Sequence, residues 1–221
     1  MRALLLGDAG VRVYATSRTA ERLEVLLGRL PADAVSRVAP IVADAGDFAG
    51  AARLAEEVTA RGGVDGVVAV LGRGWWSSGP TLDLAPSEWS AVLDEMLTAH
   101  FALARAFVPL LKARAGSTYL SIGGGAAFVP VREAGLMSVA AAGQAMLTRV
   151  LSREAGDGPP RIAELVINGP VATRESAHFA EPGWITADDV GLVVSELILR
   201  GATTWQPSRI DGPLIVMSER A

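Results

Sequence analysis

The chain has 221 residues, of which 50% are hydrophobic, and it carries a formal net charge of −4. This length and composition predict one compact α/β domain with a full core, spanning residues 1–221. The net negative charge and the lack of a basic cluster argue against nucleic acid as a partner. The chain has no cysteine, which excludes disulfides and zinc–cysteine sites, and we expect no metal site.

The hydrophobic stretches are too short for a membrane protein. The longest apolar runs, such as Val67–Gly72, fall far below the roughly 20 residues that span a bilayer. The N-terminus also lacks the pattern of a signal peptide. We therefore expect a cytoplasmic protein without a membrane partner.

The first elements alternate between strand and helix patterns. Met1–Gly10 fits either a strand or the last turns of a helix, and we favour the helix because the strand pattern of Val11–Arg18 follows at once. Glu21–Leu30 and Phe48–Arg61 read as helices on either side of a strand at Val38–Val42. Neither interpretation of the N-terminal segment gives the strand, glycine-rich turn and helix that bind a pyrophosphate.

The middle of the chain supplies the predicted central strand and a long helix. Asp65–Leu71 is an unbroken apolar run, typical of a buried strand in a parallel sheet. The loop after it carries Trp75 and Trp76, which cannot both point inward, so one of them can line a pocket or an interface. Ser87–Lys112 follows as a long helix, without the Glu or Gln that a capping box begun by Ser87 would need.

The stretch from Tyr119 to Arg149 organises the chain. It begins with a strand at Tyr119–Ile122, breaks at the three glycines 123–125 and continues as a long helix of small residues. This switch in periodicity across a glycine loop is typical of half a βαβ unit. Ligands of such proteins bind beyond the carboxyl ends of the strands, so we expect the glycine loop to face the site.

The last third of the chain again alternates between strand and helix patterns. Arg161–Ile167 reads as a strand and Thr186–Leu199 as a helix with Thr186 as its N-cap. Asp188 and Asp189 complement the positive end of that helix. Ile210–Met217 is expected to be the last strand.

These elements, in this order from Val11 to Met217, resemble the short-chain dehydrogenase/reductase family. The segments VRVYATSR, EWSAVLDEM and NGPVATRES carry the resemblance most clearly. It implies an α/β fold, a Rossmann-like doubly wound domain with a mainly parallel sheet. On this resemblance the family's first strand and phosphate-binding turn are missing. Residues 175–184 would form a short substrate lid.

The family's catalytic residues are absent from the matching positions. The serine position is occupied by Gly124, the tyrosine position by Met137, the lysine position by Ala141 and the proton-relay asparagine position by Met96. The only lysine is Lys112 and the only tyrosines are residues 14 and 119, so no Tyr-x-x-x-Lys pair exists in any register.

Four residues match the family's cofactor-binding positions. Arg18 matches the arginine that contacts the 2′-phosphate of NADP, and Asp44 matches the aspartate that binds the adenine. The family ends its central strand in Asn-Asn-Ala-Gly, and of these four residues only the glycine is present here, as Gly72. Thr173 matches the threonine of the family's loop that contacts the nicotinamide. Arg18 and Asp44 also have local interpretations, as an exposed arginine and as a helix cap. We expect no cofactor to bind, and NADP(H) rather than NAD(H) if one does.

Three functions remain open. In the first, the chain has lost hydride transfer from NAD(P)H and is a binding or structural subunit, forming a homo-dimer or tetramer or pairing with an intact family homologue. The family's dimers use the helices matching Ser87–Lys112 and Val139–Ala155. Another of the three is an NAD(P)-dependent oxidoreductase that uses non-standard residues.

The second function is that of a cofactor-independent cyclase, isomerase or lyase acting on an apolar small molecule. Its polar chemistry would come from His100 or Ser138, or from Arg132 or Glu133. Its pocket would be lined by large apolar side chains: Trp75, Trp76, Met96, Met137 and Trp184.

Overall fold

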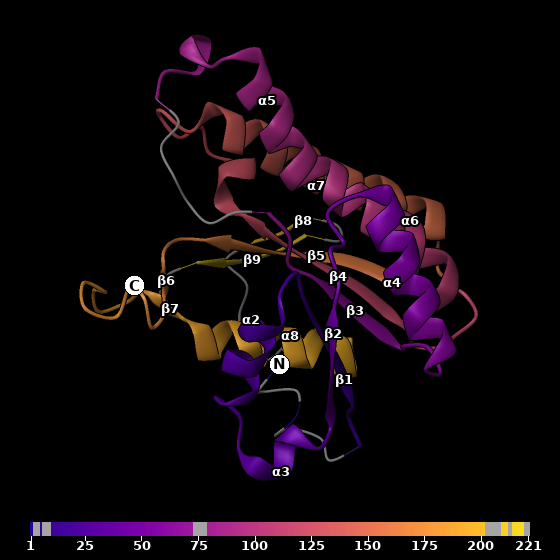
Figure 1. Ribbon diagram of the computed structural model, residues 1–221. Helices are drawn as coiled ribbons and strands as arrows, with labels where there is room; N and C mark the ends of the chain where they lie inside the picture. The colour runs from indigo at the N-terminus through magenta and orange to yellow at the C-terminus, as the bar shows by residue number, and fades with distance from the viewer. Residues whose placement is uncertain (2–4, 6–9, 73–78, 202–208, 212–213, 219–221) are drawn as a thin grey trace.

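The computed structural model describes residues 1, 5, 10–72, 79–201, 209–211 and 214–218. Within them the fold is an α/β sandwich with a mainly parallel sheet, as the sequence predicts (Figure 1). Trp75 and Trp76 lie outside the described residues. In the N-terminal segment only Met1, Leu5 and Gly10 are described, and Leu5 is helical, its N–H donating to the Met1 carbonyl at 3.1 Å. At that residue the helical interpretation is confirmed.

The strands form one five-stranded and two two-stranded sheets. Strands β1 (Val13–Ser17) and β2 (Val38–Val42) pair in parallel. The larger sheet has the order β3-β4-β5-β9-β8, in which only β8 is antiparallel. Its strands are β3 (Gly66–Ala69), β4 (Thr118–Gly124), β5 (Arg161–Asn168), β8 (Arg209–Asp211) and β9 (Leu214–Ser218). A short parallel pair, β6 (Val171–Ala172) and β7 (Ile185–Thr186), lies outside it.

Helices cover both faces of the strands (Figure 1). One face is covered by α4 (Phe48–Ala60), α6 (Ala99–Leu111) and α7 (Gly135–Ala155), and the other by α2 (Ala20–Leu27) and α8 (Ala187–Arg200). The shorter helical elements are α3 (Ala32–Val35), η1 (Thr81–Asp83), α5 (Pro86–Leu93), the π-helical turn η2 (Asp94–Thr98) and η3 (Gly125–Ala127). One core joins β2, β3 and β4 beneath α4 and α6, through Ile41, Ala69 and Tyr119.

Helix starts follow local sequence signals. Thr186 caps α8 by accepting from the Asp189 N–H at 3.0 Å, as predicted. Thr19 caps α2 in the same way, at 3.4 Å from the Arg22 nitrogen. The cap of α4 is Asp47, whose carboxylate accepts from the Gly50 N–H at 2.6 Å, so the interpretation of Asp44 as this cap is wrong. Side-chain oxygens satisfy the free N–H groups of a first helical turn in each case.

Three further predictions need correction. The predicted helix Ser87–Lys112 begins earlier, at Pro86, and is divided by η2. At its start the Glu88 carboxylate accepts from the Ala85 N–H at 3.0 Å. The strand expected to break at Gly123 continues through Gly124, because β4 pairs with β5 along this length. The predicted last strand is two strands, β8 and β9.

The predicted central strand is less buried than expected. β3 is only half-buried over Gly66–Val68, and Val70, just after it, is 70% exposed. Among the described residues β3 pairs with β4 alone and β1 pairs with β2 alone. Each of these two strands therefore has one edge without a described neighbour, which explains the exposure.

Candidate functional site

The family's serine, tyrosine and lysine positions lie on elements in contact with one another. Gly124 ends β4, η3 follows it, and α7 packs against both, with Met137 in its first turn and Ala141 one turn later. Met137 is half-buried and Ala141 is buried. A Cβ atom added to Gly124 would meet no other atom within 4 Å, so a side chain at this position has room. None of the three residues carries a group that can donate or accept a proton.

Met96 lies beside Gly72, in the segment that follows β3. It belongs to the π-helical turn η2, and such turns are frequent at functional sites. Its Cγ would lie 3.2 Å from a Cβ atom on Gly72. Gly72 has φ of +95°, a conformation that favours glycine. The structure thus brings together two of the predicted site positions, with an apolar contact between them.

His100 is buried in the helix layer and does not reach the surface. It is 3% exposed on α6, and neither ring nitrogen makes a hydrogen bond of standard geometry among the described residues. Burial lowers the pKa of His100 to about 4, an effect that the backbone of Leu71 only partly offsets. The imidazole is therefore neutral near pH 7, and it is enclosed rather than presented to a ligand.

The other polar candidates are engaged locally. The Ser138 hydroxyl donates to the Ala134 carbonyl at 3.1 Å, within its own helix. Arg132 and Glu133 form an exposed ion pair with 3.6 Å between Arg132 Nε and Glu133 Oε1. Neither arrangement supplies an acid or base held at a defined point beside Met137.

The matched cofactor positions follow strand ends but have local partners. Arg18 follows β1 and is exposed, and Asp44 follows β2 and accepts from the Gly46 N–H at 2.9 Å. The Thr173 hydroxyl accepts from the Ser176 N–H at 3.2 Å. The described residues contain no glycine-rich turn between a strand and a helix before β1. The side chains of Asp44 and Thr173 are thus already engaged within the chain.

The lid segment forms an aromatic cluster of its own. It projects from the body of the fold between β6 and β7 (Figure 1). The ring of Phe179 contacts those of His178 and Trp184 edge to face, with centroids 4.7 and 5.8 Å apart. Trp184 is thus packed within the lid, and its predicted contact with a ligand pocket remains a prediction.

Two grooves lie on the helix layer instead. One, of about 740 Å³, lies between α4 and α6. The other, of about 520 Å³, lies where α4, η2 and α6 meet α7, and Phe48 borders both. Met96, Met137 and Trp184 line neither groove, so the predicted apolar pocket is not among these two.

A buried polar cluster escaped the sequence analysis. It joins β4, β5 and α7 around a carboxyl group, and its members are Ser121, Gln144, Thr148 and Glu164. The signal that could have found it is a single charged residue in the apolar run IAELVI, because a charge inside a buried strand needs partners.

The described part of the chain has neither a cluster of metal ligands nor a membrane-spanning helix. No three His, Cys, Asp or Glu side chains there are grouped as a metal site would require. None of the helices described combines the length and apolarity that a bilayer crossing needs.

Comparison with known proteins identifies the family. The sequence profile of a family described as enoyl-(acyl carrier protein) reductase matches residues 2–190. Curated proteins give no match.

Solved structures agree in fold. A short-chain dehydrogenase/reductase of the glucose/ribitol dehydrogenase type from Brucella melitensis is 19% identical, with a TM-score of 0.79 over 98% of this chain and 89% of its own. ElxO with NADP bound is 14% identical, with a TM-score of 0.81 over 98% and 91%. The citronellol catabolism dehydrogenase AtuB from Pseudomonas aeruginosa is 20% identical, with a TM-score of 0.75 over 98% and 87%.

At these identities the structures show the fold alone, and the sequence profile carries the assignment. The chain belongs to the short-chain dehydrogenase/reductase family.

Proposed function

We propose that this family member has lost hydride transfer from NAD(P)H and serves as a binding or structural subunit. One observation carries the proposal: the four catalytic positions hold Met96, Gly124, Met137 and Ala141, none of which has an ionisable group. Acid–base catalysis needs such a group within about 3 Å of the reacting oxygen. We infer that no cofactor is used, and that Arg18 would favour NADP(H) if one bound.

The polar groups nearby do not compensate for the loss. His100 is enclosed and neutral, and the Ser138 hydroxyl is bonded within its helix. Both were candidates for a cofactor-independent enzyme, together with Arg132 and Glu133, which form an exposed ion pair. Their surroundings therefore support the subunit over a cyclase, isomerase or lyase.

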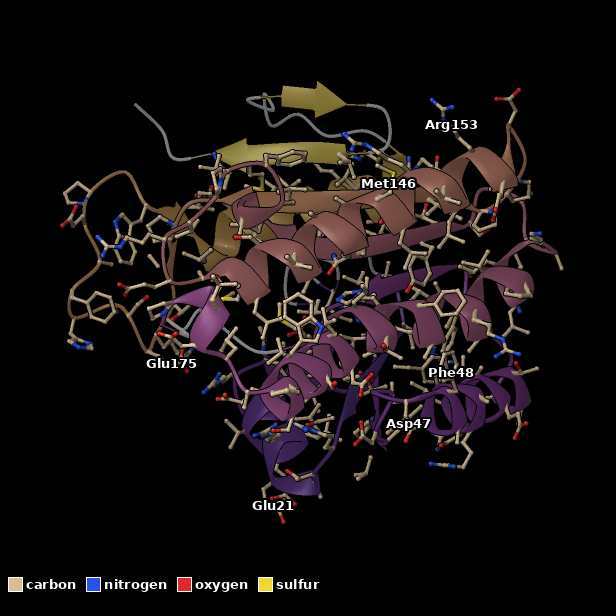
Figure 2. All side chains as sticks on the ribbon, turned by 90° about the horizontal axis from the view of Figure 1, so that it is seen from above. Glu21, Asp47, Phe48, Met146, Arg153 and Glu175 are labelled. Atoms are coloured by element: carbon tan, nitrogen blue, oxygen red, sulfur yellow. The ribbon has the colours of Figure 1, made fainter. Side chains whose placement is uncertain are left out.

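An apolar surface on α4, α6 and α7 supports a protein partner. Its large hydrophobic side chains are between 42% and 54% exposed: Phe48, Phe101, Val139, Met146 and Val150. Phe48 and Met146 lie on the face seen in Figure 2. Patches of this kind on a folded chain mark interaction sites. We propose that this surface, hereafter the α6–α7 face, binds a second copy or an intact family homologue.

The proposal that no cofactor binds is tested by thermal denaturation with increasing concentrations of NADPH and, separately, of NADH. We expect no saturable shift at millimolar concentrations. A bound ligand at 100 times its Kd stabilises by about 2.7 kcal/mol. For a chain of this size that raises the Tm by roughly 5–10 °C. A saturable shift of this size would contradict the proposed loss of the cofactor.

The proposal that the α6–α7 face binds a protein partner is tested by sedimentation velocity and by pull-down with an intact homologue. Met146→Glu should abolish association, since it places a charge in the α6–α7 face. Val25→Glu is the matched control, because Val25 is 55% exposed on α2, away from this face, and should leave association unchanged. A wild-type chain that stays monomeric and also leaves the homologue unbound would refute the subunit role.

A further inference from the structure

Glu164 is a carboxylic acid in the middle of a buried strand. It lies in β5 between Ala163 and Leu165 and has no exposed surface. Its register partner in β4 is Ser121. Carboxylates are almost never fully buried unless they are paired, so this side chain needs a physical account.

Three elements meet at its carboxyl group. Oε2 of Glu164 accepts from the Thr148 hydroxyl of α7 at 2.9 Å and from the Ser121 hydroxyl of β4 at 3.3 Å. One residue closer to the carboxyl end of β4, Gln144 Nε2 donates to the Ile122 carbonyl at 3.0 Å. Glu164 and Gln144 thus tie α7 to both strands at successive levels.

The second carboxyl oxygen is poorly satisfied. Among the described residues Oε1 of Glu164 is buried and makes no hydrogen bond of standard geometry, and Gln144, which lowers the pKa of the acid, donates with good geometry only to the Ile122 carbonyl. It lies against Gly123, where an added Cβ atom would overlap with it. A protonated carboxyl tolerates this environment better than a carboxylate, whose full charge would have one oxygen without a donor.

Little in the surroundings offsets a negative charge. From α7, Arg149 is the one charged group whose field lowers the pKa of Glu164. β4 contributes the hydroxyl of Ser121 and the backbone of Gly123, and β9 contributes Leu214 at the facing register position. Burial is the largest effect, and it raises the pKa of Glu164 above that of an ordinary glutamate, although the hydroxyls, Gln144 and Arg149 oppose it.

We propose that Glu164 is a proton-controlled latch that holds α7 against β4. With its proton the carboxyl is stable in the closed contact. Without it, the carboxylate favours a locally opened state in which water reaches Oε1. Because α7 also carries Met137 and Ala141, opening alters the candidate site at the carboxyl end of β4. The proposal is independent of whether hydride transfer has been lost.

The test uses the natural absence of cysteine in the chain. Ala145 is 2% exposed on the inner side of α7, so Ala145→Cys reports when α7 moves away from the strands. Its rate of reaction with a thiol reagent is measured from pH 5 to pH 8 with Glu164 and with Glu164→Gln. The ratio of the two rates cancels the ionisation of the thiol itself. We expect this ratio to rise by up to tenfold per pH unit between the ordinary pKa of a glutamate, which applies in the opened state, and its raised pKa in the closed contact, and to level off above the latter.

Two controls keep the proposal open to refutation. Ala51→Cys is fully buried on α4, away from the latch, and its rate ratio should not change with pH. If Glu164→Gln does not fold, hydrogen exchange of the Ile122–Gly124 amides in the wild-type chain, corrected for intrinsic exchange, is followed over the same range. A rate ratio for Ala145→Cys that stays flat, or corrected exchange that does not accelerate, would overturn the latch.

Discussion

Two levels of the contact between β4 and α7 differ sharply in chemistry. At the carboxyl end of the strand lie Gly124 and, on α7, Met137 and Ala141, none of which has an ionisable side chain. Three residues back along the strand, Ser121 and, from α7, Thr148 surround the carboxyl of Glu164, which water cannot reach. These polar groups therefore lie in the buried interface between the elements rather than at the edge of the sheet.

The adjacent glycines of β4 belong to different levels. Gly123 lies against the Glu164 carboxyl, whereas Gly124 faces open space. Neither has a positive φ, so alanine can adopt the backbone conformation of both. The comparison therefore predicts opposite outcomes for the same substitution at neighbouring positions.

The largest effect is expected for Gly123→Ala. Its methyl group would overlap with Oε1 of Glu164, and the side chain is anchored in the core by the bond from Thr148 to its other oxygen, Oε2. Overpacking of this kind costs about 1–3 kcal/mol, and we expect the upper end, about 3 kcal/mol. Urea denaturation measures the loss in the free energy of unfolding.

Gly124→Ala is the matched control. It should change stability by less than about 1 kcal/mol, and in the stabilising direction, because alanine restricts the unfolded chain. Combining Gly123→Ala with Glu164→Asp, which shortens the acid, should recover part of the loss. Equal losses at the two glycines would show that the two levels do not differ.

A second effect, of roughly 2 kcal/mol, concerns His100. Its pKa is lowered by burial to about 4, so the folded protein holds it neutral while the unfolded chain takes up a proton below about pH 6.5. Its contribution to stability is complete above pH 6.5 and is lost as the pH falls toward 4. Between pH 7 and pH 5 this amounts to roughly 2 kcal/mol.

The variant His100→Leu separates this effect from the other titrating groups. Leucine fills a similar volume without a proton to bind, so the variant should lose about 2 kcal/mol less than the wild type between pH 7 and pH 5. Urea denaturation at the two pH values gives the comparison. Identical pH dependence in the two proteins would mean that His100 titrates normally, as a ligand-facing acid or base would.

Local sequence signals predicted the fold better than they predicted burial. The N-cap at Thr186 and the strand at Val38–Val42 were predicted correctly, because capping and apolar periodicity act over a few residues. The exposure of Val70 was not, because it depends on which strand lies beside β3. The glycines of β4 were read as a break, but pairing with β5 outweighs the weak strand preference of glycine.

The candidate site shows the same limit. The resemblance placed Gly124, Met137 and Ala141 on elements that are in contact. It could not reveal that His100 is enclosed, since a helical pattern does not fix which turn faces a neighbouring loop. Nor could it show that Glu164 meets Thr148, because those residues come from different elements.

The smallest effect separates the two hydroxyls of the deeper level. Thr148 is 2.9 Å from Oε2 of Glu164 and Ser121 is 3.3 Å from it, while Ser121 and Thr148 are 3.3 Å from each other. Thr148→Val keeps the shape but removes the shorter bond, and it should lower the free energy of unfolding by about 1.5 kcal/mol. Ser121→Ala should lower it by about 0.5 kcal/mol, since its hydroxyl is the more distant donor. Urea denaturation at pH 6 of the two single variants and of the double variant measures the coupling energy between the two hydroxyls. If Ser121→Ala lowered the free energy of unfolding more than Thr148→Val does, β4 rather than α7 would be the main support of the buried acid.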